Sequence, residues 1–488
     1  MDFFDPQKQK RHAIRLGVGY ALIGLALSLA TVILLYQAYG FGIDKTGRVI
    51  QNGLVFLSSQ PKGGDIYIDG KLYKSQTNSR LVLPAGQYKV RIVRGDYRTW
   101  QRAITVEGGS VERFDYPFLF PSKLTTAAAK QYAEPASITT QSGDRRWLLV
   151  GVGNTNGFDL YDLKSNKPTP RAVTIADDIL SPGTTTGWQL VKWADDNRHV
   201  LLRRLYTKDG NGASEYVLFD RQDPTQSQNV SQLLGFTPTT IELRKGNYDQ
   251  YFAYDQANGT VFTASLKKPT PQLYLEHVLN FTSDEDTALY VTTQDAPAGK
   301  AYVHLKQNDD PALTLRTLPA GSPYLLDLGT YNGTPYVAAG AQSENKVYVY
   351  QDPIAALRQG SDVPAPVQIL KVNAPNYVVF STNARFVMAE NNDHFAVYDA
   401  ETDKGYSYQI KSPLDDAGSH ALWMDGYRLD VVSGGKLQVF DFDGANPEVL
   451  MPAAAAYEPE FDPSYHEAYV MNAQHVLTQT PLLAARDQ

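Results

Sequence analysis

Residues 58–92 read SSQPKGGDIYIDGKLYKSQTNSRLVLPAGQYKVRI, and this stretch decides the fold of the region around it. Apolar and polar residues alternate along it, as they do in strands with one buried face. Turn signals interrupt the alternation at 61–64, at Asp69-Gly70 and at 84–86. The stretch therefore predicts short antiparallel strands joined by tight turns.

The same alternation, followed outward, predicts six strands, at 53–58, 65–68, 79–83, 87–93, 100–106 and 110–114. In the fourth strand, Val90 and Ile92 fall on one face, and Lys89 and Arg91 fall on the other. This pattern is typical of a half-buried sheet with a basic outer face. We predict a small β-sandwich over residues 53–121.

This region resembles a PEGA domain, a small β-sandwich of bacterial and archaeal envelope proteins. The resemblance is carried by turn and core positions, namely Ser59, Pro61, Gly63, Gly64, Thr77, Leu81, Leu83, Gly86, Tyr88, Val90, Gly95, Tyr97, Trp100 and Val106. The chain departs from the family pattern at Gly64, where the family has Ala, and at Asn78, where it has Pro. The resemblance implies an envelope module, for which binding of wall material is suspected, and implies no catalytic residue.

The composition of the whole chain favours a mainly β protein of several domains. With 488 residues, two or three domains are expected. The 31 tyrosines and the many glycines and prolines favour short strands joined by turns. The absence of cysteine excludes disulfides, thiol nucleophiles and thiolate metal sites.

An uncharged segment near the N-terminus predicts a membrane anchor. Residues 16–43 carry no formal charge, and a helix needs about 20 apolar residues to cross a bilayer. A signal-peptide core has about 7–15 residues, so an uncleaved transmembrane helix is favoured over a cleaved signal peptide. Four basic residues precede the segment in the tail 1–15, and two follow it closely. This bias places the N-terminus in the cytoplasm and residues 44–488 outside, with the inverted topology as the alternative.

Small residues line one face of this predicted helix at Gly17, Ala21, Gly24 and Ser28. Such faces let two membrane helices approach closely. Because small residues are also common in membrane helices generally, helix–helix contact stays one of two interpretations.

Charge is distributed unevenly along the chain. Residues 53–121 hold ten Lys/Arg against six Asp/Glu, whereas residues 122–488 hold 29 against 43. The acidic body argues against a nucleic-acid partner. Basic residues that we predict to contact an anionic surface are Lys71, Lys74, Arg80, Lys89, Arg91, Arg94, Arg98 and Arg102. The linker 44–52, at most about 30 Å long, would hold them near the membrane; an ordinary solvated sheet face is the alternative.

After a second predicted linker, 122–135, a hairpin pattern recurs eight times. The second strands of these hairpins begin near residues 158, 216, 261, 301, 347, 395, 437 and 476. The mean spacing of about 45 residues matches a four-stranded propeller blade. We therefore predict a β-propeller over 136–488, with eight blades favoured and seven open. Its units resemble the WD40-like repeats of bacterial surface proteins.

The chain lacks the motifs of common catalytic and metal centres. It has no Gly-x-Ser-x-Gly elbow and no His-Glu-x-x-His pair. His466 and His475 lack a third ligand, and the loops 209–215 and 441–448 lack the spacing of a calcium loop. Aspartates recur at the ends of second strands, at Asp162, Asp220, Asp352, Asp399 and Asp441. Their repetition indicates a structural turn, so no catalytic, cofactor-binding or metal-binding residue is predicted.

Together these patterns predict a non-catalytic, membrane-anchored, extracytoplasmic binding or scaffold protein of the cell envelope. Its partners would be the lipid bilayer, through residues 16–43, and wall polymer or an envelope protein. One alternative is a propeller-type glycan or peptide hydrolase, which paired, unrepeated carboxylates in the channel would support. The other is a purely structural, self-associating envelope component. Ligand identity and oligomeric state stay open.

Overall fold

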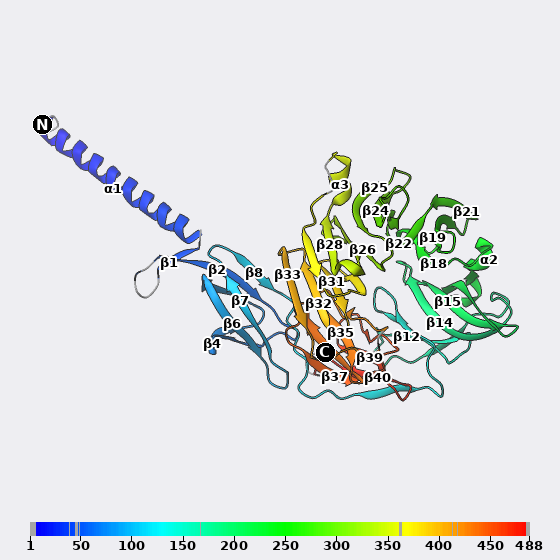
Figure 1. The fold of residues 1–488 in the computed structure, drawn as a ribbon. Coiled ribbons are helices and arrows are strands. Elements are labelled where there is room, and N and C mark those ends of the chain that lie inside the picture. Colours follow the sequence, from blue (N-terminus) through cyan, green and yellow to red (C-terminus); the bar gives the residue numbers. More distant parts are fainter. Residues whose placement is uncertain are drawn as a thin grey trace. The chain divides into compact units, whose positions relative to one another are not determined.

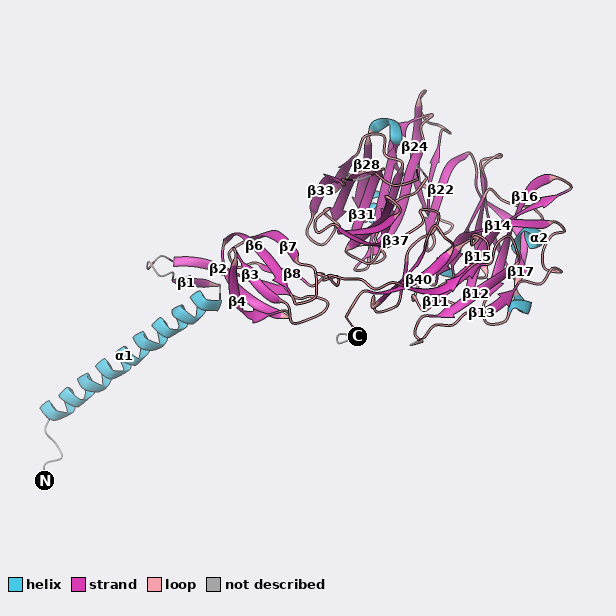
Figure 2. Cartoon of the chain, turned by 90° about the horizontal axis from the view of Figure 1, so that it is seen from below, coloured by secondary structure: helices cyan, strands magenta, loops and turns pink. Residues whose placement is uncertain are grey.

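The structure, a computed structural model, describes residues 6–38, 40–43, 47, 49–165, 167–360, 364–411, 413–416 and 418–484. The chain forms two compact units (Figure 1). The first contains the N-terminal residues to Lys123 together with Ala484, and the second spans Leu124–Leu483. Strands make up most of both units, and one long helix stands at the N-terminus (Figure 2). The mainly β class is confirmed.

The N-terminal helix α1 spans Pro6–Ala38. Its segment Gln9–Tyr36 has a mean hydropathy of 2.3, and none of it is buried against the rest of the protein. At 1.5 Å per residue these 28 residues extend about 42 Å, enough to cross a hydrocarbon core of about 30 Å. By length and composition the helix fits a membrane anchor or a signal sequence.

The predicted ends of this helix are wrong. It begins well before residue 16, and it stops at Ala38, because the chain turns at Gly40 and enters strand β1 (Phe41–Ile43). The three residues of β1 are as apolar as a membrane helix, but they pair with the start of β2 (Val49–Leu57). The predicted linker 44–52 is therefore wrong over residues 49–52, which belong to β2. Residues 44–46 and 48 lie outside the described residues, as do residues 1–5 of the predicted tail.

In the part of the first unit that the structure describes, the strands form two four-stranded sheets, as expected for a sandwich. One sheet comprises β1, β2, β5 (Ser79–Pro84) and β8 (Val111–Phe114). The other comprises, in order, β4 (Lys71–Gln76), β3 (Asp65–Ile68), β6 (Gly86–Val93) and β7 (Trp100–Val106). The core residues are at most 6% exposed and include Val55, Leu57, Ile66, Leu81, Leu83, Val90, Ile92, Trp100, Ile104 and Val106.

The second unit is a β-propeller, whose described residues form eight sheets of four strands. The first two sheets are β10 (Thr139–Gln141), β11 (Trp147–Gly151), β12 (Gly157–Asp162), β13 (Arg171–Thr174), then β14 (Thr184–Trp193), β15 (His199–Lys208), β16 (Asn211–Asp220), β17 (Gln228–Asn229). The next two are β18 (Thr240–Leu243), β19 (Gln250–Asp255), β20 (Thr260–Ser265), β21 (Lys268–Leu275), then β22 (Val278–Asp284), β23 (Thr287–Thr292), β24 (Lys300–Gln307), β25 (Leu313–Pro319).

The remaining sheets follow the same antiparallel order. The fifth and sixth are β26 (Tyr324–Tyr331), β27 (Thr334–Ala341), β28 (Lys346–Gln351), β29 (Gln368–Lys371), then β30 (Tyr377–Phe380), β31 (Phe386–Asn391), β32 (His394–Asp399), β33 (Lys404–Gln409). The last two are β34 (Leu422–Trp423), β35 (Arg428–Ser433), β36 (Lys436–Asp441), β37 (Glu448–Pro452), then β38 (Glu460–Phe461), β39 (Glu467–Met471), β40 (Val476–Pro481), β9 (Ala127–Gln131). Short helices in the connections are η1 (Pro224–Gln226), α2 (Val230–Leu234), η2 (Arg244–Gly246), η3 (Gln342–Glu344) and α3 (Pro353–Arg358).

Each of the eight second strands expected from the hairpin spacing is the third strand of one sheet, from β12 to β40. The last sheet is completed by β9, whose Lys130 lies opposite Leu477 of β40. The predicted linker 122–135 is therefore wrong over β9. Its sequence, AAAKQ, shows no strand alternation, so the pairing comes from the edge that β40 offers. The propeller ends at Leu483, and Ala484 donates its N–H to the Tyr97 hydroxyl of the first unit (2.8 Å).

Apolar contacts join neighbouring sheets around the propeller. Between the first and the last sheets, a core of Leu148 and Tyr161 packs against Tyr469, Met471 and Leu477, all at most 2% exposed. Similar cores lie between the first and second sheets and between the fifth and sixth. A sheet of four strands has two apolar faces, so each sheet needs a neighbour on both sides. Contact between the first and last sheets meets that need at the point where the ring closes.

Candidate functional site

The predicted basic residues lie on different faces and at different heights of the sandwich. Lys89 and Arg91 are exposed on the outer face of β6, on the opposite side from Val90 and Ile92. The Arg91 guanidinium lies 5.2 Å from the centre of the Tyr67 ring, which is opposite Arg91 on β3. Of the other exposed members, Lys71 and Lys74 lie on β4, and Arg80 lies on β5 in the second sheet.

The remaining three basic residues are partly buried. Arg102 lies opposite the core residue Val90 and on the same side of β7 as Ile104, so it shares the inward side of its sheet. Its guanidinium lies 5.7 Å from the centre of the Tyr116 ring. Arg94 donates to the carbonyl of Lys62 (2.8 Å), and Arg98 is half-buried. The eight residues therefore do not form one patch.

Height along the sandwich separates the basic residues further. The turn at Ala85 lies at the end where α1 leads into the sandwich, because the Ala85 N–H donates to Gln51 at the start of β2 (2.9 Å). At about 3.3 Å per residue, Arg94 lies about 16 Å farther along the strand direction than Lys89. Lys89 is therefore nearer the helix than Arg94 or Arg98.

The four small residues of the predicted helix–helix face lie on α1, where all four are exposed. A Cβ added at Gly17 or at Gly24 would have no atom within 4 Å. The structure thus leaves this face open in the single chain.

The PEGA-like turn residues Ser59, Gly64 and Thr77 contact one another within the sandwich. The Thr77 hydroxyl contacts the Ser59 hydroxyl (2.6 Å) and accepts the N–H of Gly64 (2.8 Å). A Cβ at Gly64 would lie 2.5 Å from Ile92 Cγ2, which explains why this turn needs Gly. The motif holds two turns together around a buried hydroxyl pair.

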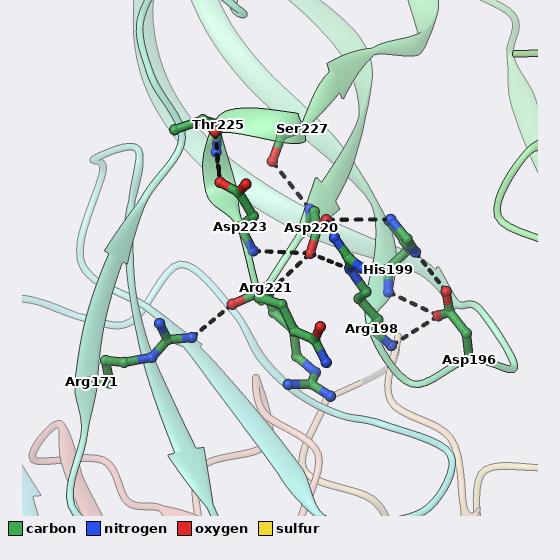
Figure 3. A network of polar contacts seen from close by, with 10 residues as sticks. Arg171, Asp196, Arg198, His199, Asp220, Arg221, Asp223, Thr225 and Ser227 are labelled. Atoms are coloured by element: carbon green, nitrogen blue, oxygen red, sulfur yellow. Dashed lines mark hydrogen bonds and ion pairs between the residues drawn. The ribbon is translucent and has the colours of Figure 1, made fainter.

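Three of the five recurring aspartates, Asp162, Asp220 and Asp399, make the same contact, each within its own sheet. The Asp220 carboxylate accepts from the Arg198 guanidinium, with Nε at 2.9 Å, and from the N–H of Gln222 (2.9 Å), as Figure 3 shows for Asp220 and Arg198. Asp162 and Asp399 repeat the arrangement, each with the Arg that precedes the second strand of its sheet and with the backbone N–H two residues later. The repetition supports a structural role for these residues.

The loop 441–448 is closed by its own hydrogen bonds. Asn446 donates to Asp441 (2.8 Å), and Asp443 accepts the N–H of Ala445 (3.3 Å). Among the described residues, no group of three or more His, Asp and Glu side chains is placed to hold a metal ion.

Charged residues that do not repeat line the centre of the propeller, which we call the channel. The first strands of neighbouring sheets contact one another there, as β14 contacts β18 and β22 contacts β26. Burial raises the pKa of Glu242 on β18 to about 7 and the pKa of Asp327 on β26 to about 7. Burial also raises the pKa of Asp284 on β22, and Lys192 on β14 opposes all three shifts. Four sheets thus present charges to one another across the channel.

A second acidic group lies on the other side of the channel. Burial raises the pKa of Asp430 on β35 and of Glu460 on β38 well above the usual range, and the charge of Glu458 adds to both shifts. The charge of Arg145 opposes both shifts, and Arg145 also donates to the carbonyl of Met424 (2.9 Å). Asp430 and Glu460 come from the seventh and eighth sheets.

Two cavities open beside this acidic group. The larger, about 890 Å³, is lined by Trp188, Leu190 and Glu458, among others. The smaller, about 370 Å³, is lined by Tyr377, His420, Asp430 and Glu458, among others. Strand β34 beside the smaller cavity has two residues, which lie opposite Asp430 and Leu429 of β35.

A buried carboxylate holds the histidine of the smaller cavity. Glu390 on β31 is fully buried, and its Oε1 lies 2.8 Å from Nδ1 of His420 and accepts the N–H of Ala421 (3.3 Å). The His420 ring stacks on Tyr377, with centres 4.1 Å apart and planes 8° apart. This arrangement fixes both rings at the cavity wall.

The sequence prediction missed every residue of the channel. Tyr377, His420, Asp430 and Glu458 are separated by as many as 81 positions and belong to three sheets or their connections. In the sequence these four residues depart from the repeated pattern, whereas Asp399 and its equivalents follow it.

Comparisons with known proteins support the sandwich assignment. Residues 52–119 match the family model of the PEGA domain, which confirms the resemblance stated for residues 53–121. No curated protein matches the chain significantly. Among solved structures, Hsv2 of Kluyveromyces lactis is similar at 9% identity and a TM-score of 0.39, over 65% of this chain and 98% of that chain. The Cps50 (Swd1) β-propeller domain of Myceliophteria thermophila is similar at 14% identity and a TM-score of 0.38, over 66% and 97%.

Replacement of Asp399 by Ala should destabilise the propeller by about 3–5 kcal/mol, because it leaves the mostly buried guanidinium of Arg385 without its partner. Denaturant unfolding of the full chain measures this change. Asp310→Ala, which removes the exposed pair with Arg358, is the matched control and should cost less than about 1 kcal/mol. Equal effects of the two variants would contradict a structural role for the repeated pair.

Glu242→Gln should flatten the dependence of stability on pH. Because the folded-state pKa of Glu242 is raised from 4.5 to about 7, the folded protein holds this proton to higher pH than the unfolded chain. The contribution of this group to stability is therefore full below about pH 4.5 and is lost as pH rises through 7. The variant should gain on the order of 2 kcal/mol over the native chain between pH 5 and pH 8. Exposed Glu276→Gln should leave the profile unchanged, and a parallel profile for Glu242→Gln would refute the assignment.

Proposed function

We propose that the chain is a membrane-anchored, extracytoplasmic binding or scaffold protein of the cell envelope. In this proposal α1 is the anchor, the sandwich stands at the membrane end, and the propeller carries the ligand site. The observation that carries the proposal is a contrast within the propeller. Residues that recur from sheet to sheet make structural contacts, whereas residues that do not recur line the cavities. A binding protein needs such a scaffold with a distinct site.

The attachment of the sandwich to α1 supports a role near the membrane surface. Strand β1 follows the helix after only two residues and is paired into the sandwich sheet, and the Tyr36 and Phe41 rings lie 4.9 Å apart. The PEGA match of residues 52–119 is consistent with an envelope location. The exposed outer face of β6 carries the predicted basic residues Lys89 and Arg91, so we assign contact with anionic wall polymer to that face.

One observation favours a second candidate, a propeller-type hydrolase. Asp430 and Glu458 are unrepeated carboxylates beside one cavity, and glycan hydrolysis uses a pair of carboxyl groups. Incubation of the full chain with purified wall glycan separates the two candidates, because only a hydrolase releases new reducing ends. Absence of release with intact binding supports the binding protein.

Binding of the detergent-solubilised full chain to purified wall material should weaken about fivefold or more in the double variant Lys89→Glu/Arg91→Glu and should weaken with salt. Co-sedimentation at low and high salt measures both effects. Lys267→Glu/Lys268→Glu makes the same charge change at exposed propeller positions and should leave binding intact. Failure of the native chain to sediment would refute wall binding, and equal losses in both double variants would refute the assignment to the sandwich face.

Single cysteines test the topology, because the native chain has none. Asp209→Cys, at the exposed tip of the β15–β16 hairpin, should react with a membrane-impermeant maleimide in intact cells. Lys10→Cys should react only after lysis, since it lies on the side predicted to be cytoplasmic. The reverse labelling pattern would establish the inverted topology, and loss of the Lys10→Cys peptide from the mature protein would establish cleavage.

A further inference from the structure

The groups that line the smaller channel cavity favour a positively charged ligand over a negatively charged one. Its described lining residues include Asp416, Asp430 and Glu458, and none of them is Lys or Arg. The rest of the lining supplies aromatic, hydroxyl and small apolar groups, among them Tyr377 and Ser419. An anion would meet three carboxyl groups there, whereas a cation would meet hydrogen-bond acceptors.

Asp430 is the lining residue that most favours a bound ligand. Its side chain is 2% exposed and lines the cavity, and among the described residues it has no hydrogen-bonding or ion-pair partner. A buried carboxylate without a partner is unfavourable by several kcal/mol as a general rule. Asp399 is a comparably buried carboxylate that does have a partner. It is 1% exposed and accepts two hydrogen bonds from Arg385.

Other acceptors surround the same space. Glu458 projects from the segment before β38 and keeps access to solvent. When Nδ1 of His420 donates to Glu390, its Nε2 is left as an acceptor. The Tyr377 ring adds an aromatic face and a hydroxyl, and aromatic faces attract cations. An ammonium group has three donors and no acceptor, which complements this set.

We propose that the cavity lined by Tyr377, His420, Asp430 and Glu458 binds an aliphatic ammonium group. The inference rests on the proposed ligand-binding role of the propeller and names the chemical class of the ligand. A volume of about 370 Å³ accommodates a small diamine or a lysine side chain. Glu458 also lines the larger cavity, so the rest of a lysine-containing peptide would extend into that space.

Isothermal titration of the full chain in nanodiscs tests the proposal with three probes: putrescine, N-acetyl-lysinamide and the tripeptide Ala-Lys-Ala with blocked ends. Butane-1,4-diol is the uncharged control. We expect saturable binding of at least one amine and none of the diol. Tighter binding of the tripeptide than of the two small amines would identify a peptide as the source of the ammonium group, and equal or weaker binding would identify a small amine.

Two variants assign the binding to the cavity. Asp430→Asn and Glu458→Gln should each weaken amine binding about tenfold or more, because each removes a charged acceptor while keeping the side-chain size. Glu242→Gln changes a buried carboxyl on the other side of the channel and should alter binding less than about twofold. Thermal unfolding checks that the variants fold, and Glu458→Gln, at a solvent-accessible connection, serves if Asp430→Asn does not.

Three outcomes would overturn the proposal: no saturable binding of any amine, equal binding of the diol, or unchanged affinity in a folded Asp430→Asn or Glu458→Gln protein. The wall-binding experiment can fail without affecting this one, because the ammonium probes are soluble and do not need the sandwich. Conversely, wall binding that survives while amines fail would leave the proposed binding role and reject only this ligand class.

Discussion

The pairing of β9 with β40 is the constraint on which the propeller depends. Every sheet in this unit has two apolar faces, and an open row of sheets would leave two of them in water. Strand β9 enters the last sheet from the N-terminal side of the unit, while β38, β39 and β40 come from its C-terminal side. Closing the ring thus joins the two ends of a 360-residue span and covers the faces at Leu148 and Tyr469.

Ring closure also explains how the propeller can vary locally without losing its fold. Positions that hold a sheet together recur, as the Arg–Asp contacts at Asp162, Asp220 and Asp399 do. Residues that face the channel contact residues of several sheets and do not take part in these repeated contacts within one sheet. They can therefore differ from one sheet to the next. The two-residue strands β34 and β38 are such departures, and a cavity forms beside them. The scaffold and the candidate site are therefore built from separate sets of residues.

Sequence reasoning reached the fold class and most strands because alternation and turn residues are local signals. It located β3 and β7 at their observed bounds. It missed β1, whose three apolar residues extend the membrane segment, and β4, whose KLYKSQ sequence is too polar to alternate. It also missed β9, because AAAKQ becomes a strand only where β40 offers an open edge. These failures share one cause: the pairing partner, and not the local sequence, determines the strand.

The candidate site was beyond sequence reasoning for a related reason. Asp399 and Asp430 are equally buried, at 1% and 2% exposed, and in the sequence both are aspartates of second or third strands. Only the structure distinguishes them: one faces a guanidinium supplied by its own sheet, and the other faces a cavity. A protein keeps a buried carboxyl at low free-energy cost when a partner neutralises it, as Arg385 does for Asp399. For Asp430 the described residues supply no ion-paired or hydrogen-bonded partner, and Arg145 acts on it only through its charge, so the remaining neutralisation comes from either a proton or a ligand. The acceptors gathered around the same cavity favour the ligand, since a lone proton needs none of them.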